Sequence, residues 1–433
     1  MIGASLAMLL LVGQAPSSSP KALVERLGSP RFAERERATE ALARLGADAL
    51  PALRAARDAK DPEVRARAAA LVEKTEARLL TQPTLVTLDL KDRPLTEAVE
   101  AIGDQAGIKL ALTPEGSPAW RARVNLQEPA PLPFWKALDR LCVAGNLQYN
   151  LGMQGSSRNR EPLLTLFAGN VASAGPTSDF GPFRVQLMNL HFQRDVTFAA
   201  GPRPTEQFFI QMQVAAEPRL SVSQGGPIQI LEALDDRGQS LMLPVGGTSM
   251  TRHSGYFGMS SGAVVQMQAH LKRPEQPGAT IRKLRGSVPI AVATRKPGPL
   301  VVPLAGASGK FFRNDQVSLS IQEVRANLNA NQTIVDLVVR PQGGPGAATH
   351  ALGARGGDFS LPRQDQHQQQ IEVIDAKGQT IPWYPTSFDA EGARIVLTVT
   401  PPDGVAVPTE LRYYSLARAA TEVQFEFADV MMP

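Results

Sequence analysis

The chain has 433 residues, enough for about three domains, and its 43% hydrophobic and 20% charged residues exclude a wholly disordered or fibrous protein. Its 36 glycines, 35 prolines and 6% aromatic residues favour turns and strands over long helical bundles. The net charge of +4 is small for this length, and no stretch combines a basic run with stacking aromatic residues, so we expect no nucleic-acid partner.

The N-terminal residues 1–20 carry no charged side chain and contain a short apolar run, Leu6 to Val12, followed by Gly13-Gln14-Ala15-Pro16. This pattern predicts a cleaved signal peptide, although no basic residue precedes the run; a mis-assigned start and a buried N-terminal segment are the alternatives. No later stretch has the about 20 uninterrupted apolar residues of a membrane-spanning helix. We therefore expect an exported bacterial protein of the periplasm or cell envelope, with no transmembrane segment in the mature chain.

The chain has a single cysteine, Cys142, which excludes an intramolecular disulfide. No cysteine lies near residue 15, so lipid attachment there is excluded as well. Cys142 ends a helical apolar pattern that begins at Phe134, and we expect a small buried residue, because a reactive thiol needs an electropositive and partly exposed setting.

Residues 21–80 contain an internal repeat, in which Ser29-Pro30-Arg31-Phe32 recurs 32 residues later as Asp61-Pro62-Glu63-Val64. Ser29 and Asp61 suit helix N-caps, and the prolines then occupy the first helical position. Gly46 predicts the end of the first helix. Apolar residues with helical spacing in that helix are Phe32, Ala38, Ala41, Leu42 and Leu45. The segment resembles a HEAT-like repeat of helix pairs, whose charged outer face is either solvated or a docking surface.

Residues 81–170 predict two copies of a strand–helix–strand unit and a final strand, a small α+β layer. The expected strands are Leu85–Leu90, Ile108–Leu112, Val124–Leu126, Leu147–Leu151 and Leu163–Phe167, with helices from Pro94 and from Pro133 to Val143. We expect Trp120 and Trp135 to pack in or beside this core; stacking on a ligand is the alternative.

The stretch from Val86 to Val99, VTLDLKDRPLTEAV, together with Gly107-Ile108-Lys109-Leu110, resembles the short N-terminal (STN) domain shared by secretins and TonB-dependent receptors. The resemblance implies a periplasmic module that contacts other proteins and has no catalytic residues. Neither a secretin pore nor a receptor barrel follows in this chain, so secretion or uptake is not implied.

From Phe183 onward, period-two alternation bounded by Gly, Pro, Asn and Asp predicts strands. Similar segments recur in the same order in residues 176–303 and 304–433; Ile230–Leu241 and Gln370–Ile381 lie 140 residues apart. Each carries an Asp-x-x-Gly-Gln hairpin turn, in which glycine supplies a positive φ. We therefore expect a duplication into two tandem, mainly antiparallel, immunoglobulin-like β-sandwiches.

No motif predicts a reaction. Gly258-Met259-Ser260-Ser261-Gly262 matches the G-x-S-x-G string of serine hydrolases, but a loop precedes it and a strand-like segment follows, whereas a nucleophile elbow needs a strand and then a helix. The five histidines lack metal-ligand spacing, and the pairs Asp235-Asp236 and Asp89 with Asp92 lack the oxygen-rich loop of a calcium site. We expect no catalytic residue, no cofactor and no metal.

The expected fold is multidomain α+β. Its divisions are a signal peptide at 1–20, a HEAT-like repeat at 21–80, an STN-like domain at 81–170, and β-sandwiches at 176–303 and 304–433. Because all of these resemble binding modules, we expect a non-enzymatic cell-envelope adapter or structural element with protein partners.

Two alternatives stay open. One is an exported hydrolase or carbohydrate-binding protein that uses loops of the first β-sandwich near His253, Ser260 and Trp383. For Trp383-Tyr384-Pro385 itself, we expect packing at a strand end rather than an exposed patch for sugar or peptide. The other alternative is a periplasmic accessory subunit that docks on a secretin-like channel through residues 81–170.

Overall fold

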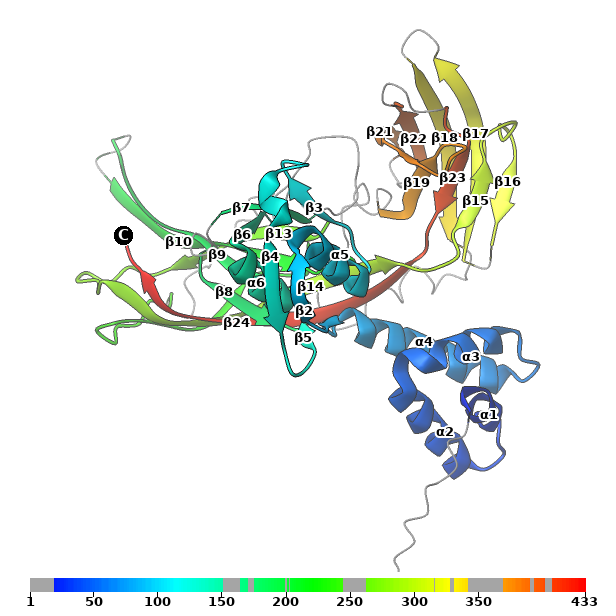
Figure 1. Ribbon diagram of the computed structural model, residues 1–433, viewed down its shortest axis with the longest axis horizontal. Coiled ribbons are helices and arrows are strands. Elements are labelled where there is room, and N and C mark those ends of the chain that lie inside the picture. The colour runs from blue at the N-terminus through cyan, green and yellow to red at the C-terminus, as the bar shows by residue number, and fades with distance from the viewer. Residues whose placement is uncertain are drawn as a thin grey trace, which may run out of the picture. The chain divides into compact units, whose positions relative to one another are not determined.

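The structure is a computed structural model and divides into two compact units, residues 1–79 and 80–433, each of which is described by itself (Figure 1). The described residues are 19–150, 164–169, 175–198, 201, 203–243, 262–314, 316–327, 331–341, 369–389, 393–401 and 407–433. Within these ranges, no helix combines the length and apolarity needed to cross a bilayer.

The first unit is helical. Its helices are α1 (Pro20–Arg26), α2 (Phe32–Leu45), α3 (Leu50–Ala55) and α4 (Pro62–Leu80), with short 3-10 turns at Gly46–Ala49 and Ala56–Asp58. The inner faces of these helices share one apolar core, in which Leu27, Leu42, Leu53 and Ala68 are fully buried. Gly46, with a φ of 60°, follows the last residue of α2 as predicted.

The two repeat motifs start their helices differently. Asp61 Oδ1 accepts the Glu63 N–H at 2.8 Å, and α4 begins at the next residue after Asp61, as predicted. Ser29 Oγ accepts the Arg31 N–H at 3.2 Å, but α2 begins at Phe32, two residues later than predicted. The difference arises because the Arg31 carbonyl, rather than that of Ser29, accepts the first helical hydrogen bond.

Phe32 departs from the apolar face on which the repeat places it. Its side chain is 65% exposed, and the Arg35 guanidinium lies 5.7 Å from its ring. Val64, the equivalent residue of the second motif, is buried. Leu45, at the other end of the same helix, is 37% exposed, so only the middle of the predicted apolar stripe reaches the core.

The second unit begins with a small α+β domain, and the predicted helices and strands are present with shifts of one to three residues. Its elements are β1 (Leu85–Val86), β2 (Asp89–Pro94), α5 (Leu95–Ala106), β3 (Leu110–Thr113), β4 (Arg123–Gln127), β5 (Leu132–Pro133), α6 (Phe134–Gly145), β6 (Leu147–Asn150) and β7 (Leu164–Ala168). The strand expected over 85–90 is divided, because β1 pairs with β5 whereas β2 pairs with β4. β7 lies between β3, which is parallel to it, and β6, which is antiparallel.

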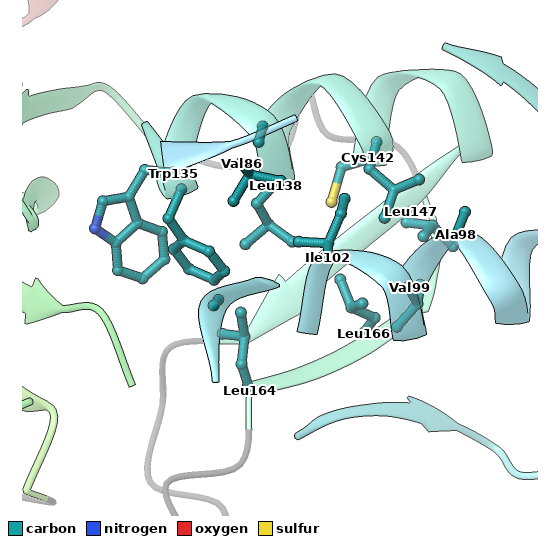
Figure 2. Packing of buried hydrophobic residues seen from close by; sticks show 14 of the residues in the cluster. Val86, Ala98, Val99, Ile102, Trp135, Leu138, Cys142, Leu147, Leu164 and Leu166 are labelled. Atoms are coloured by element: carbon teal, nitrogen blue, oxygen red, sulfur yellow. The ribbon is translucent and has the colours of Figure 1, made fainter. Parts of the chain in front are cut away.

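Figure 2 shows the core of this domain, where α5 and α6 meet the β7 strand. Ile102 comes from α5, Leu138 and Cys142 come from α6, and Leu166 comes from β7; all four are fully buried. Trp120 and Trp135 belong to the same core, at 3% and 1% exposure, so their predicted packing is confirmed.

The rest of the second unit consists of antiparallel sheets, which confirms the β-rich C-terminal half. One sheet has the order β13-β10-β9-β8, made of β8 (Thr177–Phe180), β9 (Phe183–Thr197), β10 (Arg203–Ala216) and β13 (Val264–Leu271). A second is built on β14 (Thr280–Arg295), with β11 (Ser221–Gln224) and β12 (Gln229–Asp235) on one side and β24 (Leu416–Met431) on the other. We call these two sheets the first β region.

The second β region also has two sheets, around a core that includes Leu319, Leu337 and Leu397. One has the order β16-β17-β18-β22-β21, made of β16 (Phe311–Arg313), β17 (Val317–Asn327), β18 (Gln332–Pro341), β22 (Arg394–Val399) and β21 (Trp383–Phe388). The other has the order β15-β23-β19-β20, made of β15 (Leu300–Pro303), β23 (Glu410–Tyr413), β19 (Ile371–Ile374) and β20 (Thr380–Ile381).

Equivalent strands occupy equivalent positions in the two β regions. The order β13-β10-β9-β8 corresponds to β22-β18-β17-β16, and each has a register shift in its long hairpin, at Met188 in β9 and at Gln322 in β17. The Asp-x-x-Gly-Gln turns also match: Gly238 and Gly378 have φ values of 77° and 78°. Both turns are therefore hairpin turns of the kind predicted.

The last strand does not lie in the region to which the sequence division assigns it. Residues 304–433 are expected to form one body, but β24 pairs with β14 along its whole length, from Leu416 with Arg295 to Met431 with Thr280. In the second β region, the position next to β23 that corresponds to β24 is filled by β15. The physical reason is that a strand with alternating apolar residues fits the edge of either sheet, and chain connectivity alone does not choose between them.

Candidate functional site

A buried arginine joins the α+β domain to the first β region. Arg184 of β9 is 1% exposed, and its guanidinium donates two hydrogen bonds to Asp179, at 2.6 and 2.7 Å, and two to Asp139 of α6, both at 2.7 Å. The rings of Trp135 and Tyr149 lie 5.2 and 6.0 Å from the guanidinium carbon. We call this group the Arg184 joint.

The single positive charge of this joint is paired with two carboxylates. Burial opposes the charge of Arg184, but the hydrogen bonds to Asp179 and Asp139 outweigh it and raise the pKa of the guanidinium. Burial has the opposite effect on Tyr149, whose hydroxyl lies against the same guanidinium: it raises the pKa of that hydroxyl. Each carboxylate accepts two hydrogen bonds from the planar guanidinium. A lysine ammonium group could not make these four hydrogen bonds. We therefore interpret the joint as structural.

A second polar contact joins the same two parts. Glu217, 2% exposed, accepts the Thr84 N–H at 2.8 Å, the Thr84 hydroxyl at 2.6 Å and Arg219 Nε at 2.9 Å. Arg219 also donates to the Gln82 carbonyl at 2.9 Å, and the Trp135 indole donates to the Pro182 carbonyl at 3.0 Å. The Arg184 joint and the Glu217 contacts together form two polar joints, which fix the α+β domain against the base of β9 and β10. Ala215 and Val264 of the first β region belong to the apolar core of the α+β domain.

The hairpin of β9 and β10 continues beyond the body of its sheet. β13 pairs with β10 only as far as Phe208, so Gln193–Thr197 and Arg203–Gln207 pair only with each other among the described residues. Every side chain described in this stretch is exposed, including Val196 at 46% and the following Phe198 at 78%. Figure 1 shows the two strands extending at the upper left. We call residues 193–198 and 203–207 the arm.

Of the three residues named for an active or sugar-binding loop, only Trp383 lies within the described residues. His253 and Ser260 lie outside the described residues. Trp383 is in β21 of the second β region, 8% exposed in that region's core, so its predicted packing is confirmed, while Tyr384 beside it is 45% exposed. In the described part of the chain, no group of three or more His, Cys, Asp or Glu residues could hold a metal ion.

Cys142 is buried in the α+β core, as predicted, and is unsuited to thiol chemistry. Burial, together with the charge of Asp139, raises the pKa of its thiol to about 12. The Arg184 charge acts in the opposite direction and is outweighed. A thiol with this pKa is protonated at neutral pH and is a poor nucleophile.

Asp235 and Asp375 hold the two equivalent turns. Asp235 Oδ1 accepts the N–H groups of Arg237 and Gln239 at 3.0 and 2.7 Å, and Asp375 Oδ1 accepts those of Lys377 and Gln379, both at 2.8 Å. Both carboxylates therefore hold the turns, as predicted.

Comparison with family models, curated proteins and solved structures finds no significant match to this chain. Sequence reasoning missed the Arg184 joint, because an arginine within a strand carries no sign that it is buried. It also missed the arm, although the loss of apolar alternation from Gln193 to Thr197 was a usable signal of a strand exposed on both faces.

Proposed function

We propose that the chain is an exported, non-enzymatic protein of the bacterial cell envelope that acts as a protein-binding adapter or structural element. In this proposal the helical unit is a HEAT-like module, residues 81–170 are an STN-like module, and the two β regions are immunoglobulin-like sandwiches. Modules of these kinds bind other proteins, so the proposed partners are envelope proteins.

The arm is the observation that carries the proposal. A two-stranded ribbon that packs on nothing is only marginally stable in water. The arm nevertheless ends in exposed apolar side chains, Val196 and Phe198, which gain stability when a partner covers them. Because the two polar joints fix the base of the same hairpin to the α+β domain, a partner bound at the arm would be held in a defined position relative to that domain.

The alternatives draw less support from the geometry. Trp383 lies in a core rather than beside a loop of the first β region, which weakens the hydrolase or sugar-binding loop. Docking of residues 81–170 on a secretin-like channel is compatible with the exposure of Val143 on α6 and Leu85 on β1, at 70% and 60%, but these residues do not by themselves select a channel as the partner.

Site-specific photo-cross-linking in cells tests the proposal. A photoreactive residue at Phe198 of the full-length chain should give one dominant adduct, and mass spectrometry should identify an envelope protein in it. The same residue at Phe311 of β16, which is 56% exposed on the second β region, is the matched control. Equal or diffuse labelling at both positions would refute the adapter role of the arm.

A double substitution gives an independent measurement. Val196→Ser and Phe198→Ser together should abolish co-purification of the identified partner. The thermal midpoint should stay unchanged, because both side chains are exposed. Mass analysis of the protein recovered from a periplasmic fraction tests export, with the loss of about the first 15 to 20 residues as the expected result.

A further inference from the structure

The face of the β13-β10-β9-β8 sheet that carries Ala215 and Val264, where the α+β domain packs, also carries an uncharged block of hydrogen-bonding side chains. Three rows of directly paired residues cross strands β9, β10 and β13: Gln186–Gln213–Gln266, Asn189–Gln211–Gln268 and His191–Phe209–His270. We call these nine residues the amide platform. Six are amides, two are histidines, one is phenylalanine, and none is Asp, Glu, Lys or Arg.

The pairing register places each row on one face, and side-chain contacts link neighbouring members in all three rows. Asn189 Nδ2 donates to Gln211 Oε1 at 3.0 Å, and Gln213 Nε2 donates to Gln186 Oε1 at 2.7 Å. The Phe209 ring stacks on His191, with centroids 4.9 Å apart, and lies 5.8 Å from His270. The opposite face of the same strands is apolar and buried, as Leu187, Met212 and Met267 illustrate.

The platform has hydrogen-bonding capacity to spare. Gln266 and Asn189 are exposed, and Gln268 and Gln211 are half-buried. Each side-chain amide of Gln266 and Gln268 carries a carbonyl acceptor and two N–H donors, and none of these atoms is hydrogen-bonded to another residue within the described ranges. Gln213 is 4% exposed and serves to hold Gln186. The three rows span about 14 Å along the strands and about 10 Å across them.

The equivalent face of the second β region is an internal comparison. There the rows are Ser320–Val338–Arg394, Glu323–Asp336–Val396 and Arg325–Ile334–Thr398. Arg394 forms an ion pair with Asp336 at 2.6 Å, so charges occupy positions that hold amides in the first region. Sheet geometry alone therefore does not require an uncharged polar face. Because this face is uncharged in the first β region and charged in the second, we look for its cause in a ligand.

We propose that the amide platform binds a neutral polysaccharide. Sugar hydroxyls both donate and accept hydrogen bonds, which matches amide and imidazole side chains, and the ring row offers a surface for the apolar face of a sugar. The lack of charge is unsuited to anionic polymers, which bind to Lys and Arg. A protein interface is less well matched, because interface centres are enriched in aromatic residues, Met and Arg, whereas the platform has one phenylalanine among six amides.

This site differs from the arm and from the loop around Ser260, so it stands or fails independently of the adapter role. The alternation of residues in the sequence does not reveal the platform, because the register shift at Met188 changes which residues of β9 lie on this face. Gln186 before the shift and Asn189 after it share a face, although one has an even number and the other an odd number.

Affinity electrophoresis of the purified full-length protein tests the proposal. Gels containing soluble neutral polysaccharides, namely dextran, a soluble starch, a galactomannan and a β-glucan, are compared with gels containing alginate or polygalacturonate. We expect retardation by at least one neutral polymer and by neither anionic one. Gln266→Ala with Gln268→Ala should weaken that binding about thirtyfold, the loss expected for two hydrogen bonds of about 1 kcal/mol each.

Matched variants keep the result interpretable. Gln268→Glu should abolish binding of the retained polymer at an unchanged unfolding midpoint, whereas Glu323→Ala and Thr398→Ala, on the equivalent face of the second region, should bind as the parent does. The arm variant with Val196→Ser and Phe198→Ser should also bind normally. Absence of retention on every neutral polymer, binding insensitive to the platform substitutions, or a platform-dependent second copy or protein partner would each overturn the proposal.

Discussion

Arg295, the last residue of β14, is paired with Leu416, the first residue of β24, so the two residues on either side of the second β region are neighbours in one sheet. The Lys296 N–H donates to the Ser415 carbonyl at 2.8 Å and continues this pairing. The Arg295 guanidinium lies 4.6 Å from the Tyr414 ring, whose hydroxyl donates to Glu372 at 2.7 Å. The second β region is thus an insertion within a hairpin of the first.

This pairing predicts that the inserted region is dispensable for folding of the rest. Replacing residues 297–414 by a two-residue Asn-Gly turn should give a soluble protein with cooperative thermal unfolding and strand-type circular dichroism, because the joined ends already lie side by side.

Deletion of residues 416–433 from the full chain is the matched control. It should not give a stable fold, because it removes Val423, Phe425 and Phe427 from the core and leaves the edge of β14 unpaired. The insertion topology would be contradicted if the truncated chain folded normally and the excised chain did not.

Loss of the Arg184 guanidinium should destabilise the protein strongly. Arg184→Ala leaves Asp139 and Asp179 without their shared partner, and we expect a loss of about 3 kcal/mol in the free energy of unfolding, measured by urea denaturation. Arg184→Lys should restore little of it, because an ammonium group cannot make four directed hydrogen bonds.

The exposed pair of Arg194 with Glu206, at 3.6 Å on the arm, is the control for the Arg184 substitution. Arg194→Ala should change the same free energy by less than about 1 kcal/mol. Equal effects of the two alanine substitutions would remove the structural role assigned to the Arg184 joint.

The two equivalent turns should respond differently to the same substitution. Asp235 Oδ2 accepts the Gly278 N–H at 3.0 Å, whereas Asp375 Oδ2 is buried with no hydrogen-bond partner among the described residues. Asp235→Asn would set an amide N–H₂ against the Gly278 N–H, or forfeit a turn hydrogen bond, and should cost about 1–3 kcal/mol.

Asp375→Asn keeps the turn hydrogen bonds through its carbonyl oxygen and replaces an oxygen that has no hydrogen-bond partner within the described ranges, so we expect a smaller loss of stability than for Asp235→Asn. Chemical denaturation of both single variants measures the contrast. A larger loss for Asp375→Asn than for Asp235→Asn would show that the Asp375 Oδ2 atom has an essential partner.

The Cys142 thiol should be unreactive in the folded protein and should make stability fall at alkaline pH. Its folded pKa of about 12 lies above its ordinary value of 9.0, so the folded state retains the thiol proton more strongly than the unfolded state does. Its contribution is complete below about pH 9 and is lost as the pH rises towards 12.

A thiol reagent at pH 8 should therefore label Cys142 only after denaturation. Between pH 9 and 11, the unfolding free energy should fall more steeply in the parent than in Cys142→Ala, a comparison that cancels the tyrosine contributions. Rapid labelling of the native protein would contradict the buried setting of this thiol.

Local patterns were enough to predict most individual elements. Helical spacing predicted α5 and α6, alternation predicted most of the longer strands, and Asp with Gly predicted both turns, because each of these depends on residues within a few positions of one another. The predictions were wrong where packing against a neighbouring element decides whether a side chain is buried. Phe32, for example, is exposed although its repeat equivalent Val64 is buried.

The sequence by itself determined the α+β order of elements, the duplication signal in the β half and the burial of Cys142, since these follow from short-range periodicity and apolar character. Only the tertiary structure decided that β24 pairs with β14, that Arg184 binds two carboxylates, and that amides from three strands form one face. These features depend on contacts between residues far apart in the chain and on the register shift at Met188. Sheet pairing is set by the relative stability of whole competing arrangements, which no local pattern specifies.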